Sequence, residues 1–244
     1  MRASADAGGC FPTGRHYPGI AHLVRAIVRG VAEEFAADTL VRDLPFVAVD
    51  VEATGLDPAE DRVVEVACVF FHGDTIERHA WLINPGRPIS AEAQAVHQIS
   101  DADVKDAPPF AEAAVAIAAV LSRGVPLAYN AEFDKAFLLA EFGRSPPLDV
   151  TPPGLRRGVD WLDPLIWARE LQRDEKSKSL SAVAERLGIA IGQAHRAADD
   201  ATAAGHVFRA FLGDSRVPPS YAACIREQRR LGRVHKDERV YWRS

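Results

Sequence analysis

Two carboxylates stand two positions apart at the end of an apolar run. Asp50 and Glu52 follow the apolar residues 46–49. Side chains two positions apart on a strand point to the same face, so these carboxylates would lie roughly 6–7 Å apart along the backbone. They would repel each other and be costly to desolvate, and a hard cation such as Mg²⁺ or Mn²⁺ relieves both problems. The pair favours a metal site over an acidic strand end that faces water.

A third carboxylate, Asp134, falls in the first turn of a helix predicted over residues 131–142. This helix follows a short buried strand expected at residues 126–129, with Asn130 as its N-cap. An acid in the first turn is favoured by the helix dipole whatever its function. The residues alone leave open whether Asp134 also reaches a metal held by Asp50.

A fourth carboxylate comes from the pair Asp199 and Asp200, which the geometry of a helix over 197–212 separates. Asp200 leads the apolar stripe of this helix, whereas Asp199 shares its face with polar residues. A carboxylate at the head of a buried stripe needs a partner, and a metal ion would be one. Asp200 is therefore the predicted ligand. His195 would sit on the loop before this helix, where a lone histidine is usually a surface residue.

The elements that must position these side chains predict an α/β fold. Strands at 44–51, 62–71 and 75–84, joined by short connections, indicate an antiparallel meander. The later alternation of strands and helices then indicates a mixed central sheet flanked by helices. Further helices are expected at 90–97, 109–121, 164–171 and 179–187. Glu65 interrupts the second strand, where a salt bridge at the sheet edge is expected rather than a catalytic role.

One domain with extensions is expected from 244 residues that are 48% apolar and 26% charged. We predict a disordered N-terminus at 1–17, an amphipathic helical extension at 18–43, a core domain at 44–213 and a basic segment at 214–244. No signal sequence or membrane-spanning run is apparent, and three scattered cysteines suit a reducing cytoplasm.

The net charge of −5 is spread unevenly, because the last segment carries a local excess of four positive charges. Its basic and aromatic side chains could grip phosphates and stack a base. A solvated tail, or a strap across the N-terminal helix, is the favoured interpretation. The side chains concerned are Arg226, Arg229, Arg230, Arg233, Lys236, Arg239, Tyr241 and Trp242.

Three blocks in this order resemble the DEDDh (DnaQ-like) 3′–5′ exonuclease superfamily, which has a ribonuclease H-like fold. The blocks are D-x-E-x-T-G at 50–55, N-x-x-F-D-x-x-F-L at 130–138 and H-x-x-x-x-D at 195–200. The sequence A-V-H-Q-I at 95–99 also resembles the family's V-H-G-I turn, with Gln98 in place of glycine, and Tyr129 replaces a frequent histidine. The resemblance covers roughly residues 44–213.

The resemblance implies two Mg²⁺ or Mn²⁺ ions about 3.5–4 Å apart, bound by Asp50, Glu52, Asp134 and Asp200. His195 would be the general base that takes a proton from the attacking water. In-line attack on the 3′-terminal phosphodiester would release a nucleoside 5′-monophosphate. The substrate contacts implied are Thr54, Gly55, Leu56, Glu92, His97, Asn130 and Phe137.

For several of these contacts a structural role is the alternative. Leu56 and Phe137 could be core residues, Asn130 a helix cap and His97 a turn residue.

Three hypotheses for function remain open from the sequence. The first is an exonuclease on DNA, preferably at single-stranded or frayed 3′ ends, in proofreading or repair. The second keeps the chemistry and changes the substrate to RNA 3′ ends or oligoribonucleotides. The third is a non-catalytic polymerase-associated or nucleic-acid-binding module, against which the complete set of four carboxylates and a histidine argues. A DNA polymerase partner and a homodimer are also open, and no membrane partner is expected.

Overall fold

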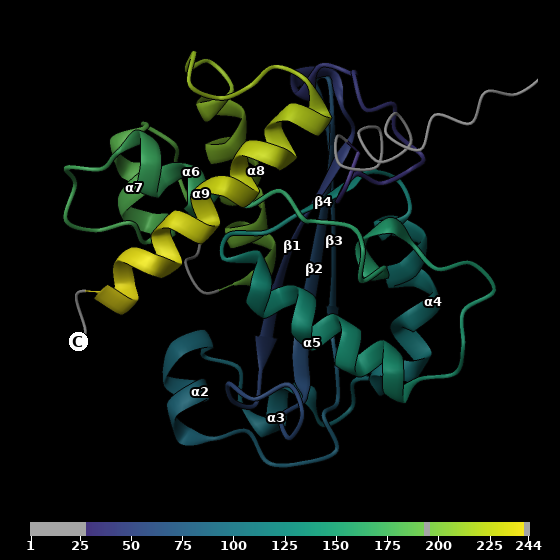
Figure 1. Ribbon diagram of the computed structural model, residues 1–244. Helices are drawn as coiled ribbons and strands as arrows, with labels where there is room; N and C mark the ends of the chain where they lie inside the picture. The colour runs from purple at the N-terminus through teal and green to yellow at the C-terminus, as the bar shows by residue number, and fades with distance from the viewer. Residues whose placement is uncertain (1–27, 193–195, 242–244) are drawn as a thin grey trace, which may run out of the picture.

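The computed structural model describes residues 28–192 and 196–241, with side chains as far as residue 237 (Figure 1). The predicted N-terminal segment 1–17 and His195 lie outside these residues. Among the helices described, none is both long enough and apolar enough to cross a membrane.

A four-stranded sheet forms the centre of the fold, in the order β3-β2-β1-β4. The strands are β1 (Phe46–Ala53), β2 (Val63–His72), β3 (Thr75–Leu82) and β4 (Val125–Leu127). The pairs β1–β2 and β2–β3 are antiparallel, whereas β1–β4 is parallel. The predicted mixed sheet is therefore confirmed.

Helices cover both faces of this sheet (Figure 1). Helix α8 (Ala197–Phe211) packs across β1 and β2 and also contacts α6 (Pro164–Leu171) and α7 (Leu180–Arg186). Helices α4 (Phe110–Leu121) and α5 (Ala131–Arg144) pack against β2 and β1 respectively. The remaining helices are α2 (Ala91–His97), α3 (Asp101–Val104) and α9 (Tyr221–Tyr241), with 3₁₀ turns at Val41–Asp43 (η1) and Pro153–Leu155 (η2).

Successive side chains of β1 point to opposite faces of the sheet, which divides the core into two clusters and sets the direction of the carboxylates. Val47, Val49 and Val51 pack into the apolar cluster that includes residues of α4 and α5. Phe46 and Ala48 belong instead to the cluster that includes α8. Asp50 and Glu52 continue this second set of alternate positions, so they face the side of the sheet on which α8 lies.

Close packing of α8 on the sheet depends on Gly205. A Cβ atom at this position would overlap the ring of Phe71 on β2. Phe71 is fully buried and stacks on Phe46 with ring centroids 4.8 Å apart. The absence of a side chain at position 205 therefore lets α8 approach the sheet closely, with its first turn near the end of β1.

The predicted helical extension at 18–43 is wrong over its described part. Residues 28–40 form turns, and only η1 is helical in this stretch. Gly30 has a φ of 89°, which a right-handed helix does not accept. Tertiary hydrogen bonds replace helical ones: Tyr221 Oη accepts from the amide of Ala32 at 3.1 Å, and the Gly30 carbonyl accepts from the amide of Asp160 at 2.8 Å.

The predicted solvated C-terminal tail is also wrong, because residues 221–241 form helix α9. Tyr221, Cys224, Ile225 and Leu231 are buried on its inner face, which packs against α6. Its first amides, those of Tyr221 and Ala222, donate to carbonyls of the segment before η1 at 2.9 Å each. The helix thus crosses the N-terminal segment, although that segment is not helical there.

Candidate active site

Three of the predicted metal ligands come together at the end of β1. One carboxylate oxygen from each of Asp50, Glu52 and Asp200 lies within 4.8 Å of the other two. All three side chains are half-buried. Asp199 points elsewhere and pairs with Arg78, with Nη2 and Oδ1 2.5 Å apart. The helix geometry therefore brings Asp200, and not its neighbour, to the carboxylates of β1.

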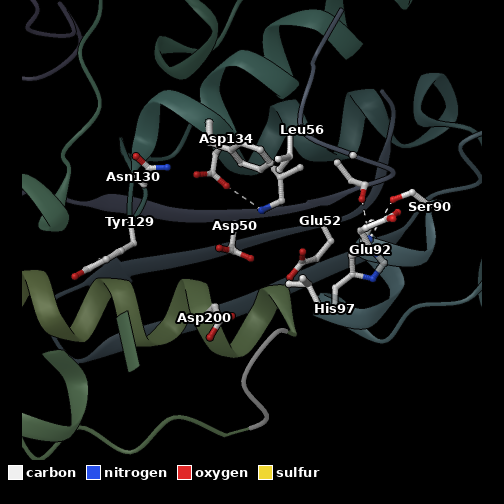
Figure 2. A pocket seen from close by; sticks show the side chains of 16 residues that line it. Asp50, Glu52, Leu56, Ser90, Glu92, His97, Tyr129, Asn130, Asp134 and Asp200 are labelled. Carbon is white, nitrogen blue, oxygen red and sulfur yellow. Dashed lines mark hydrogen bonds between the residues drawn. The ribbon is translucent and has the colours of Figure 1, made fainter. Parts of the chain in front are cut away.

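Asp134 approaches the same place from the first turn of α5. It is buried, and its Oδ1 accepts a hydrogen bond from the amide of Val51 at 3.0 Å. Figure 2 shows Asp50 between Asp134 on one side and Asp200 on the other. The bond to Val51 ties α5 to β1 between the two carboxylates of the strand, so the fourth acid is held beside the other three.

Burial and the negative charges of neighbouring acids raise the pKa values of Asp50, Glu52 and Asp134. Burial, then the charges of Asp200 and Glu65, raise the pKa of Asp50 to about 8. Burial, then Asp50 and Asp200, raise the pKa of Glu52 to about 9. The pKa of Asp134 is also raised, by burial and by Asp50. The raised pKa values favour protonation of these three acids in the metal-free protein, and a divalent cation with all-oxygen coordination is the natural replacement for the protons.

A cavity of about 590 Å³ opens over the carboxylates (Figure 2). Of the predicted substrate contacts, five line this cavity: Gly55, Leu56, Glu92, His97 and Asn130. Leu56 is 84% exposed, so its alternative role as a core residue is wrong. The volume is within the range of ordinary ligand pockets, about 300–1,000 Å³, and suits a nucleotide.

The structure does not bring Thr54 and Phe137 into this cavity. Thr54 is buried, and its hydroxyl donates to Asp61 at 3.0 Å and accepts from the amide of Arg62 at 3.1 Å. Phe137 is fully buried against Phe133, with ring centroids 4.8 Å apart. For these two residues the contacts support a structural role.

His97 lines the cavity and is itself buried at the end of α2. Its Nδ1 accepts from the amide of Ile99 at 3.0 Å, and its Nε2 lies 3.3 Å from the carbonyl oxygen of Ala53. An accepting Nδ1 is consistent with a neutral ring, and burial lowers the His97 pKa. The histidine therefore joins the end of α2 to the end of β1. Gln98, which replaces the family's glycine, adopts a left-handed φ of 60°.

Asn130 is not the side-chain cap that the sequence predicts for α5. It has a φ of 71°, and its side chain makes no capping hydrogen bond. Asp163 supplies the cap instead, because its carboxylate accepts from the amides of Asn130 and Ala131 at 3.1 and 3.2 Å. Its Oδ1 also accepts from Leu165 at the start of α6. The side chain of Asn130 thus remains in the cavity wall (Figure 2).

Glu65 forms the predicted salt bridge, with Arg196, but inside the sheet and not at its edge. Its strand β2 lies inside the sheet, between β3 and β1, and the side chain is only 3% exposed. Its carboxylate accepts from Nη2 of Arg196 at 3.1 Å and from the amide of Ala197 at 3.2 Å. Glu65 therefore fixes the start of α8, the helix that carries Asp200. In the sequence, the sign of this anchoring role is a single charged residue within the apolar run 63–71.

Asp163 fixes the start of α5, and another buried acid, Glu141, fixes the end of that helix. Glu141 is 1% exposed and accepts from Nε and Nη2 of Arg62 at 2.6 and 2.8 Å. The amide of Val63, the first residue of β2, also donates to it at 3.2 Å. Asp163 therefore ties the start of α5 to the start of α6, and Glu141 ties the end of α5 to β2. Sequence reasoning found neither residue.

The comparisons with known proteins agree with this architecture. Residues 47–208 match the RNase_T exonuclease family. DNA polymerase III PolC-type of Thermotoga maritima is 30% identical over 80% of this chain, and that of Streptococcus pyogenes is 29% identical over 73%. The chain spans only 14% and 12% of the length of these two relatives.

Solved structures share the fold. Escherichia coli exonuclease I in complex with a dT13 oligonucleotide matches with a TM-score of 0.59 and 21% identity, over 72% of this chain and 42% of that one. Exonuclease X in complex with 5′ overhanging duplex DNA matches with a TM-score of 0.54 and 24% identity, over 75% and 99% of the two chains. The family match covers well over half of the sequence, and the chain belongs to the DnaQ-like exonuclease family, as the three sequence blocks predict.

Proposed function

We propose that this exonuclease hydrolyses the 3′-terminal phosphodiester of DNA, preferably at single-stranded or frayed ends, and releases nucleoside 5′-monophosphates. The observation that carries the proposal is the group formed by Asp50, Glu52 and Asp200, with carboxylate oxygens within 4.8 Å of one another and Asp134 beside them. Exonucleases of this family use divalent metals, and two Mg²⁺ or Mn²⁺ ions are the proposed cofactors.

The four carboxylates fit such ions because they offer only oxygen atoms, the donors that hard cations prefer. Bound there, the ions would lower the pKa of a water and stabilise charge on the phosphate and the leaving oxygen. Asp50 lies between Asp134 and Asp200, and these three side chains and Glu52 would hold the ions.

The protein's own groups would place the terminal nucleotide and move the protons. Leu56, exposed at the mouth of the cavity, offers an apolar surface to a base, while Asn130 and Glu92 offer polar groups to the sugar. His195 is the proposed general base, which takes the proton as the water oxygen attacks phosphorus. The bond from phosphorus to the 3′ oxygen of the preceding nucleotide then breaks, and that oxygen gains a proton.

We propose DNA as the substrate because the names of the relatives and of the two structural neighbours given above refer to DNA. The curated relatives named above are DNA polymerases, and the two solved neighbours named above are complexes with a dT13 oligonucleotide and with 5′ overhanging duplex DNA. The same relatives support a role in proofreading or repair, and association with a DNA polymerase as a partner.

The test is shortening of 5′-labelled single-stranded DNA, and of RNA with the same sequence, in Mg²⁺, Mn²⁺ or EDTA. Asp200→Asn should abolish a metal-dependent ladder from the 3′ end, while Asp199→Asn, its neighbour on the same helix, should leave it. Faster loss of DNA than of RNA would support the DNA substrate. Metal-independent cleavage, or equal activity of both variants, would refute the proposed site.

A further inference from the structure

A charged groove of about 460 Å³ lies between α5 and α9. In Figure 1, α5 crosses in front of the sheet and α9 runs above it and to its left. The basic side chains in its lining are Arg29, Lys135, Arg229, Arg233 and Lys236. Three acidic side chains, Glu132, Asp160 and Asp163, also line it. The groove therefore has a positive excess in a chain whose net charge is −5.

These cations divide into two kinds. Lys135 and Arg229 are committed to the protein, because Lys135 donates to the Val159 carbonyl at 2.5 Å and Arg229 pairs with Asp160. Arg29 and Arg233 are exposed and have no carboxylate partner among the described residues.

Lys236 belongs with the second kind, although it pairs with Glu132 at 3.2 Å. The two side chains are 64% and 80% exposed, and such an exposed pair is weak enough to exchange for another anion.

The groove begins where the cavity of the active site ends. Asn130 and Phe133 line the cavity, and Ala131 and Glu132 from the same turn of α5 line the groove. A second hollow beside the cavity is lined by residues that include Leu56, Phe133 and Phe137. Neither the cavity nor this hollow has a lysine or arginine in its lining. A polyanion whose end enters the cavity would therefore meet the cations of this groove on the other side of the first turn of α5.

We propose that the groove binds backbone phosphates of the single strand whose 3′ end occupies the cavity. This inference rests on the proposed function. A charged face of a surface helix is commonly only solvated. Here the cations of α9 face a second element across a hollow, and their neighbour Arg29 comes from a segment far away in the sequence. Nucleic-acid backbones are bound by such clusters because neutralising phosphates releases counterions.

The experiment compares two double variants of α9 that carry the same change in charge. Arg233→Glu with Lys236→Glu reverses the groove, whereas Arg226→Glu with Arg230→Glu reverses two exposed residues outside its lining. KM and kcat are measured on a trinucleotide and on a strand of about 20 nucleotides, as DNA and as RNA, at two salt concentrations. Thermal unfolding verifies that both variants fold.

The groove variant should raise KM for the long strand about tenfold and leave the trinucleotide unchanged. The slope of log KM against the logarithm of the salt concentration should decrease by about 1.4, since two phosphate contacts are lost and each contact on a single strand contributes about 0.7. The control variant should change neither value. Equal effects of the two variants, or equal effects on both substrates, would overturn the groove.

Failure of the proposed function would look different. The wild-type protein would then hydrolyse neither substrate under any metal. Fluorescence anisotropy of the labelled long strand in EDTA still tests the groove in that case. Weaker binding by the groove variant than by the control variant would support the proposal, and equal binding would refute it.

Discussion

The carboxylate of Glu65 on β2 accepts a hydrogen bond from the backbone amide of Ala197, at 3.2 Å, and so joins the middle of the sheet to the first residue of α8. On the strand, Glu65 stands opposite Glu52 in the β1–β2 register. One buried acid thus serves as the anchor for the helix that delivers Asp200 to the two acids of β1.

Replacement of Glu65 by Leu should weaken metal binding as well as stability. The free energy of unfolding should fall by about 1–3 kcal/mol, because the Ala197 amide loses its buried partner. Mn²⁺ affinity, measured by calorimetry well below the unfolding temperature, should fall about tenfold if Asp200 is displaced. Glu77→Gln, in an exposed pair with Arg123, is the control. A loss of stability with unaltered Mn²⁺ affinity would limit Glu65 to a structural role.

The raised carboxylate pKa values predict how pH affects the metal-free protein. Asp50 and Glu52 titrate at about 8 and 9 when folded, and near 4 when unfolded, so the folded state binds more protons between these limits. The free energy of unfolding in EDTA should therefore fall as pH rises from about 5 to 8, by up to about 1.4 kcal/mol per pH unit for each group.

Urea unfolding at several pH values measures this slope. Asp50→Asn should reduce it, because one titrating group is lost and the charge beside Glu52 disappears. Mn²⁺ should restore stability most at high pH, where the carboxylates bind it without releasing protons. Stability in EDTA that rose with pH over this interval would show that the cluster is not protonated.

Asp163→Ala should destabilise the protein by about 2–4 kcal/mol. The substitution removes the cap of α6 and leaves two amides at the start of α5 without their acceptor. Because Asp134 lies in that first turn, kcat at saturating metal should also fall at temperatures where the variant is folded. Asp101→Ala provides a comparison, since it removes one side-chain acceptor that serves the amide of Ile89 and no amide of α5. Equal kcat values for the two variants would contradict this link.

Leu56→Ala should mainly affect substrate binding, whereas Phe137→Ala should mainly affect stability. Leu56 is 84% exposed, so its truncation should alter stability by less than about 0.5 kcal/mol and raise KM. Phe137 is fully buried, so its truncation should cost about 3–5 kcal/mol of unfolding free energy. Chemical denaturation and steady-state kinetics on the same samples separate the two effects. A large loss of stability for Leu56→Ala would return that residue to the core.

The sequence sufficed to predict the sheet and the position of the acids because both follow from local periodicity. The alternation of β1 puts Asp50 and Glu52 on one face, and the apolar stripe of α8 separates Asp200 from Asp199. These patterns depend only on the geometry of one strand and one helix. The family motif then added Asp134, for which the pattern alone left two explanations.

The rest depended on contacts between distant segments. Residues 28–40 have an apolar pattern of helical period, yet hydrogen bonds to α9 and to Asp160 hold them in turns. Glu65 resembles an edge residue until the order of the strands is known. Asp163 is 32 and 33 positions from the amides it caps, so no local pattern indicates its role.

The distance along the chain between Asp50 and Asp200 has a consequence for synthesis of the protein. The two acids are 150 positions apart, and the first turn of α8 is held in place by β2. A nascent chain that has emerged only as far as α7 contains Asp50, Glu52 and Asp134 but not the residue that completes the three-oxygen group. The complete group of Asp50, Glu52 and Asp200 can therefore form only after α8 has been synthesised, so a shorter nascent chain lacks one of the proposed metal ligands.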